Sequence, residues 1–143
     1  MAILPDGRIT TSIQISDPTH GVSPSANVIA DTGAELSVLP DHVLSAWLTG
    51  ATFGPTVTFR IAGSTITAIV ANGITSQAHV EPHGGGPTAV ASSTIGIPIH
   101  YVPAGATPFA AFDGILAMDL FDEFKADPVK DLAAARSYLA ERG

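Results

Sequence analysis

The sequence predicts an all-β fold of short strands accompanied by two helices. Several short segments alternate apolar and polar residues and are bounded by turn residues, which is the pattern of half-buried strands. Glycine and proline are frequent, with 14 and 11 among 143 residues, and 45% of the residues are apolar. Only two stretches show the spacing of an amphipathic helix. These observations favour a strand-rich globular domain over a disordered chain.

The first strand is predicted over residues 8–16, where isoleucine and threonine alternate with other residues. Turn residues follow at Asp17-Pro18 and over residues 21–24. The chain then enters a second, apolar strand that ends at Asp31.

The first helix is predicted over residues 40–50, directly after the Asp31 region. Pro40 suits the start of a helix, and Gly50 suits its end. Four apolar residues share the inner face of this helix: Val43, Leu44, Trp47 and Leu48. Trp47 is interpreted as a core residue, because large aromatic side chains bury much apolar area.

The middle of the chain contains further alternating segments. They are predicted to be strands at residues 57–61, 65–70, 74–80 and 95–101. Asn72-Gly73, between β-branched runs, predicts a hairpin turn. Loops are expected at residues 81–87 and 103–108, before residues 112–118 re-enter the core.

The second helix is predicted in the C-terminal tail. Asp127 can cap it and Pro128 fits its first position. Its apolar stripe would consist of Val129, Leu132, Ala135 and Leu139.

Length and charge limit the classes of function. A chain of 143 residues suffices for one domain, taken as residues 1–143. The net charge of −7 argues against a nucleic-acid partner, and the absence of cysteine excludes disulfides and thiol chemistry. No signal peptide or membrane-spanning run is recognised, so we expect a cytoplasmic protein or a domain of a larger one.

The most informative stretch is residues 28–39, which read VIADTGAELSVL. Asp31 follows a buried strand and enters a tight turn, where a carboxylate is costly to ionise unless other groups compensate. Gly33 allows a close approach of the backbone, and Thr32 can hydrogen-bond beside the acid. The simplest alternative is an ordinary β-turn that carries an aspartate.

This stretch resembles the active-site signature of aspartic proteases at every position. Residues 112–121, which read FDGILAMDLF, resemble the second conserved segment of the single-domain, retropepsin-like branch, which often reads Ile-Leu-Gly-Met-Asp. The resemblance implies a closed retropepsin-like β-barrel, the acid protease fold. Ile115, Leu116 and Ala117 would form the core segment behind the active site. Ala117 replaces the family's glycine and adds a methyl group where the family packs its backbone closely. A small shift could absorb this methyl group, or the two acids could lie slightly too far apart.

Hydrolysis of a peptide by carboxylates alone needs two acids that share one proton. Asp31 is a single such acid, so the second must come from another copy in a two-fold dimer. The resemblance implies the same homodimer, with Asp31 as the catalytic acid and base. Thr32 would brace the two loops across the axis, Gly33 would present its backbone to the peptide, and Ala34 would belong to the supporting active-site loop. No cofactor or metal is expected, and the partner is a peptide or protein substrate.

The family covers its substrate with a β-hairpin flap. Asn72-Gly73 is the first choice for the tip of this flap, because it lies between the two motifs and has hairpin chemistry. The loop at residues 84–86 is the second choice.

Two other functions remain open. His79, Glu81 and His83, with His100, could bind a metal and form a different hydrolase. Alternatively, the same fold could serve as a dimerisation or peptide-binding module without catalysis. The substitution at Ala117 favours this module, and the intact Asp31 motif opposes it.

Overall fold

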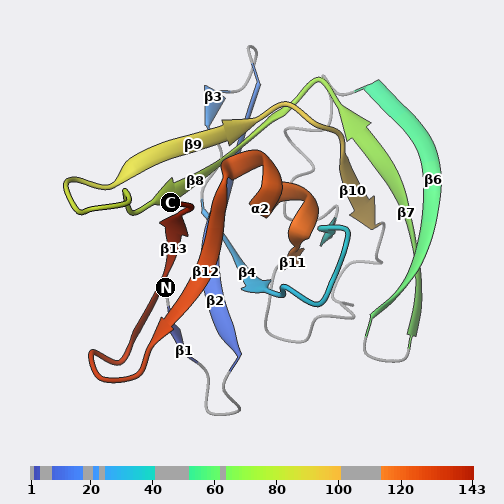
Figure 1. Ribbon diagram of the computed structural model, residues 1–143. Coiled ribbons are helices and arrows are strands. Elements are labelled where there is room, and N and C mark those ends of the chain that lie inside the picture. Colours follow the sequence, from blue (N-terminus) through green and yellow to red (C-terminus); the bar gives the residue numbers. More distant parts are fainter. Residues whose placement is uncertain are drawn as a thin grey trace.

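A computed structural model describes residues 2–3, 8–17, 21–22, 25–40, 52–61, 64–100 and 114–143 of the chain. Within these residues the protein consists mainly of strands with one short helix, which confirms the predicted all-β class (Figure 1). The strands are β1 (Ala2–Ile3), β2 (Ile9–Asp17), β3 (Gly21–Val22), β4 (Ala26–Ala30), β5 (Leu39–Pro40), β6 (Thr52–Ile61), β7 (Ser64–Asn72), β8 (Thr75–Val80), β9 (Ala89–Ser93), β10 (Ile97–His100), β11 (Ile115–Leu116), β12 (Ala126–Asp131) and β13 (Arg136–Glu141). Helix α2 (Met118–Phe124) lies between β11 and β12.

Strand β2 is central to the larger sheet. This seven-stranded sheet has the order β11-β4-β2-β8-β9, and β1 and β3 also pair with β2. The first half of β2 runs antiparallel to β4, and its second half runs antiparallel to β8. Ile13 and Ile15 of β2 are buried, as the predicted alternation of residues 8–16 requires.

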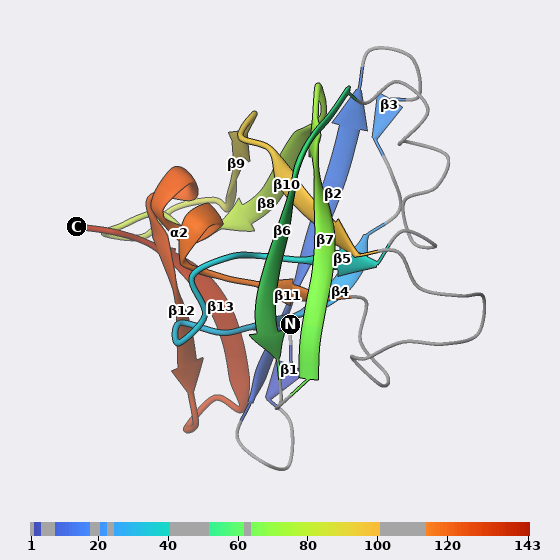
Figure 2. The same ribbon diagram turned by 90° about the vertical axis from the view of Figure 1, so that its right-hand side faces the viewer.

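The second sheet has four strands in the order β5-β10-β7-β6 (Figure 2). Its long hairpin, β6–β7, pairs from Thr52↔Asn72 to Ile61↔Ser64 and is irregular between Phe53 and Thr56. The predicted strands at residues 57–61 and 65–70 are therefore confirmed as one hairpin.

The two larger sheets share one apolar core with helix α2. The helix contributes Leu120, Phe121 and Phe124, of which Phe121 has no exposed surface. Burial of this aromatic side chain anchors the helix on the sheets. Closure of the sheets into a complete barrel stays a prediction. None of the helices in the described part of the chain is long and apolar enough to cross a membrane.

The predicted C-terminal helix is wrong, because residues 126–141 form the antiparallel hairpin β12–β13. The end of β8 supplies a partner: the Glu81 N–H donates to the Leu139 carbonyl at 2.8 Å, and the Glu141 N–H donates to the Glu81 carbonyl at 2.9 Å. Leu139 is buried and Leu132 is 74% exposed, so they do not share a buried stripe. Tertiary pairing has overridden the local helical pattern.

The hairpin predicted at Asn72-Gly73 is also wrong. Strand β7 pairs with β6 and β10, whereas β8 pairs with β2 and β9. Gly73 has a φ of +83°, as a glycine turn requires, but the turn carries the chain from one sheet to the other. Pro40, the predicted start of the first helix, lies in β5 instead. The rest of that helix with Trp47, the loop at residues 103–108 and the start of the second motif lie outside the described residues.

Candidate active site

Asp31 lies directly after β4, beside the second motif. Strand β11 pairs in parallel with β4, in the register Ile115↔Ile29 and Leu116↔Ala30. The Asp31 N–H donates to the Leu116 carbonyl at 2.9 Å. The two sequence motifs, residues 28–39 and 112–121, are therefore hydrogen-bonded neighbours although they are distant in the sequence.

The chain thus brings Asp31 against a segment that is distant in the sequence, and main-chain bonds hold it there.

The turn after Asp31 is compact and faces solvent. One carboxylate oxygen of Asp31, Oδ1, accepts a hydrogen bond from the Gly33 N–H at 2.8 Å. The Asp31 carbonyl accepts the Ala34 N–H at 3.3 Å, which closes the turn. Asp31 and Ala34 are half-buried, whereas Thr32 and Gly33 are exposed. The carboxylate is therefore held from behind and remains accessible from the front.

The chain then returns along the other side of β11. Val38 and Ile115 exchange two backbone hydrogen bonds, each of 2.9 Å. Gly114 precedes this pair with a φ of +143°, and a Cβ atom there would lie 2.4 Å from the Val38 carbonyl oxygen. Glycine is required here both by the backbone conformation and by the close approach of the two segments around Gly114 and Val38.

The start of helix α2 is bound by the Asp31 turn. The N–H groups of Met118 and Asp119 donate to the carbonyl oxygens of Ala34 and Glu35, each at 3.1 Å. These are N–H groups at a helix start, which have no partner within the helix itself. The turn therefore supplies acceptors for the first N–H groups of the helix, and these bonds fix the backbone of the turn.

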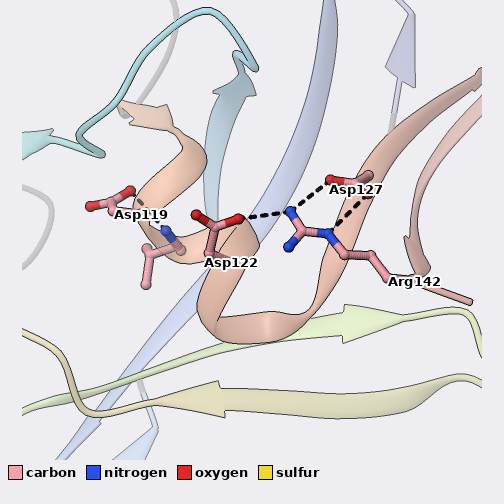
Figure 3. A network of polar contacts seen from close by, with 5 residues as sticks. Asp119, Asp122, Asp127 and Arg142 are labelled. Atoms are coloured by element: carbon pink, nitrogen blue, oxygen red, sulfur yellow. Dashed lines mark hydrogen bonds and ion pairs between the residues drawn. The ribbon is translucent and has the colours of Figure 1, made fainter.

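Ser37 and Asp119 add a side-chain connection that the sequence analysis did not single out. Asp119 Oδ1 accepts hydrogen bonds from Ser37 Oγ at 2.6 Å and from the Ser37 N–H at 3.0 Å. It also accepts the Leu120 N–H at 2.8 Å (Figure 3). Ser37 Oγ in turn accepts the Ala117 N–H at 2.8 Å. Ser37 lies inside the first motif and Asp119 inside the second. An aspartate in the first turn of a helix is the sequence feature that could have pointed to Asp119.

Ala117 lies in an unstrained backbone conformation. Its φ of −129° and ψ of −173° are extended values that any residue adopts. Its methyl group has no exposed surface and belongs to a small apolar cluster with Val38, Ala68 and Ile115. The methyl therefore fills space behind the Asp31 turn. Ile115 and Leu116 are buried as well.

The β6–β7 hairpin packs against the same cluster. Val57 of β6 and Ala68 of β7 join Ala34 and Ala117 there. The loop at residues 84–86 instead connects β8 with β9 and lies at another edge (Figure 1). The hairpin next to Asp31 is thus β6–β7, and its tip at residues 62–63 lies outside the described residues.

The residues of the alternative metal site whose side chains are described, His79, Glu81 and His83, do not form a cluster. Across the described ranges, no group of three His, Cys, Asp or Glu side chains could hold a metal ion. Glu81 binds Arg136 in an ion pair, and His79 and His83 are exposed. The side chain of His100 is not among those described.

Comparisons with known proteins complete this description. No family model matches the chain, and no curated protein matches it. Among solved structures, the chain is similar to the EIAV protease complexed with the inhibitor HBY-793. That similarity has a TM-score of 0.48 and 18% sequence identity, and covers 85% of this chain and 92% of that chain.

Proposed function

We propose that this protein is an aspartic endopeptidase that hydrolyses peptide bonds with a pair of Asp31 carboxylates, one from each copy in a homodimer. The observation that carries the proposal is the position of Asp31. It lies in a compact turn that is bound from behind by β11 and α2 and faces solvent in front. One acid of the pair takes a proton from water, and the other polarises the carbonyl group of the peptide.

Two features of the turn support a dimer rather than a monomeric site. The chain holds one copy of the Asp-Thr-Gly motif, and the reaction needs two acids. Thr32 and Gly33 are exposed at the front of the turn, where a second copy can meet them around a two-fold axis. The pair shares one proton in its working form, so the rate should follow a bell-shaped curve in pH.

The proposal also assigns the substrate cover to the β6–β7 hairpin. Val57 and Ala68 connect this hairpin to the apolar cluster behind Asp31. A peptide lying over the Asp31 turn would then be enclosed between the turn and the hairpin. This assignment replaces the earlier choice of Asn72-Gly73, which connects two sheets.

The test combines peptide cleavage and sedimentation on the same preparations. We expect the wild-type protein to cleave a mixed peptide library at mildly acidic pH, with activity per subunit falling on dilution through the dissociation constant of the dimer. Asp31→Asn should abolish cleavage and keep the dimer, because the amide preserves the shape and removes the repulsion between the acids. Asp122→Asn is the matched control, since Asp122 lies on the outer side of α2 with a 62% exposed side chain.

Two results would contradict the proposal. Cleavage near the wild-type rate by Asp31→Asn would show that Asp31 is not the catalyst. Full activity in a demonstrated monomer would remove the two-copy mechanism. A wild-type dimer that cleaves nothing would instead identify the silent dimerisation module.

A further inference from the structure

We propose that Asp119 is a positioning residue for Asp31. Asp119 acts through Ser37 to hold the catalytic turn in its working geometry. The inference rests on the proposed function, because it concerns the same carboxylate and the same reaction. It assigns a role to two side chains that touch neither the substrate nor the reacting atoms.

The geometry of the bridge begins with a single carboxylate oxygen. Asp119 Oδ1 accepts both the Ser37 hydroxyl, at 2.6 Å, and the Ser37 N–H, at 3.0 Å. The hydroxyl hydrogen of Ser37 is thereby committed to Asp119, which leaves a lone pair of Oγ free to accept the Ala117 N–H at 2.8 Å. The Ser37 side of the turn is therefore tied twice to the segment that begins α2.

The bridge restrains the end of the turn opposite to Asp31. At the near end, the Asp31 N–H is bound to the Leu116 carbonyl. At the far end, Ser37 is 1% exposed and bound to Asp119 and Ala117. The exposed residues 32 and 33 lie between these two anchors. Loss of the far anchor frees the turn to shift, and the carboxylate shifts with it.

Asp119 does more than complete the start of the helix. If Asp119 only stabilised the first turn of α2, its local bond to the Leu120 N–H would be sufficient. The two bonds to Ser37 instead join residues that are 82 positions apart in the sequence. A hydrogen bond to an ionised carboxylate is among the stronger ones, so the bridge is suited to hold a loop in one geometry.

The experiment compares four variants in peptide cleavage and in amide hydrogen exchange of the turn. Asp119→Ala removes the acceptor, whereas Asp119→Asn keeps an acceptor oxygen in the same place. Ser37→Ala removes the hydroxyl but keeps the Ser37 N–H. Asp122→Ala is the matched control: it lies on the same helix, and its carboxylate faces Arg142 at 2.9 Å, away from the turn (Figure 3).

We expect Asp119→Ala to lower kcat by about 10- to 100-fold, since small misplacements of a catalytic group are that costly. KM should change by less than about threefold, because the bridge does not contact the peptide. Exchange at the Ala34 and Ser37 amides should become faster. Asp119→Asn should recover most of kcat and of the protection, Ser37→Ala should lie between the two Asp119 variants, and Asp122→Ala should match the wild type.

Three results would overturn the inference. In the first, folded Asp119→Ala keeps the wild-type kcat and the wild-type exchange at the turn. In the second, Asp119→Asn is as impaired as Asp119→Ala, which would mean that the acceptor geometry is not what matters. If Asp119→Ala does not fold, Ser37→Ala decides the matter, and wild-type kcat in that variant would also contradict the bridge. Failure of the proposed function looks different, because the wild type itself would then cleave no peptide.

Discussion

Replacement of Ala117 by glycine should destabilise the protein without improving catalysis. The family pattern has glycine at this position, so a methyl group that strained the loop would instead make Ala117→Gly faster or its dimer tighter. The structure places the methyl group of Ala117 in a fully buried position, in contact with the cluster of Val38, Ala68 and Ile115. Its extended backbone gains nothing from glycine.

The size of the effect follows from two terms. Removing one buried methyl group costs about 0.8 kcal/mol of apolar burial. Glycine in an ordered segment costs about 0.5–1 kcal/mol more, because the unfolded chain gains conformational freedom. The free energy of unfolding should therefore fall by about 1.5 kcal/mol, which for a domain of this size lowers Tm by about 3–6 °C.

The measurement is thermal and urea unfolding of Ala117→Gly beside peptide turnover. Ala126→Gly is the matched control, since Ala126 is equally buried but lies in β12, away from the Asp31 turn. Both variants should lose similar stability, and turnover well below Tm should stay within about twofold of wild type for both. A higher Tm or a faster turnover in Ala117→Gly alone would show that the methyl strains the loop after all, and would refute the packing argument.

Three further predictions concern other sites. Gly114→Ala should lower the unfolding midpoint in urea by the equivalent of about 2 kcal/mol, because its Cβ would meet the Val38 carbonyl in a left-handed backbone; an unchanged midpoint would contradict this. Ala135→Gly should raise the free energy of unfolding by about 0.5–1 kcal/mol, and Tm with it, since Ala135 has a φ of +52° in an exposed turn. A lower Tm would count against that conformation. Hydrogen bonds to Asp127 and then to Asp122 raise the pKa of Arg142, so it stays charged; Arg142→Gln should lower Tm slightly, and a loss that persists unchanged in high salt would exclude an ionic cause.

The positions of most strands along the chain could be predicted from the sequence. Ile13 and Ile15 of β2 are buried where the alternation placed them, and the two halves of the β6–β7 hairpin lie where turn residues separated them. Such patterns are local, because side chains on a strand alternate between its two faces whatever the strand pairs with.

The partners of these strands could not be predicted in the same way. Asn72-Gly73 was correctly recognised as a turn, but β8 pairs with β2 and β9 instead of β7. The C-terminal segment has the capping residues and the apolar spacing of a helix, but it forms the hairpin β12–β13, which is hydrogen-bonded to Glu81. Helix propensity amounts to tenths of a kcal/mol per residue, and a new strand partner outweighs it.

The sequence by itself determined the strand-rich class and the candidate acid, Asp31, because both depend on residues that are close in the chain. Only the tertiary structure decided what lies around Asp31. It placed Leu116 behind the acid, made room for the methyl of Ala117, and joined Ser37 to Asp119 across 82 positions. Those contacts arise when distant segments fold together to satisfy buried polar groups, and no local pattern records which partner each group will find.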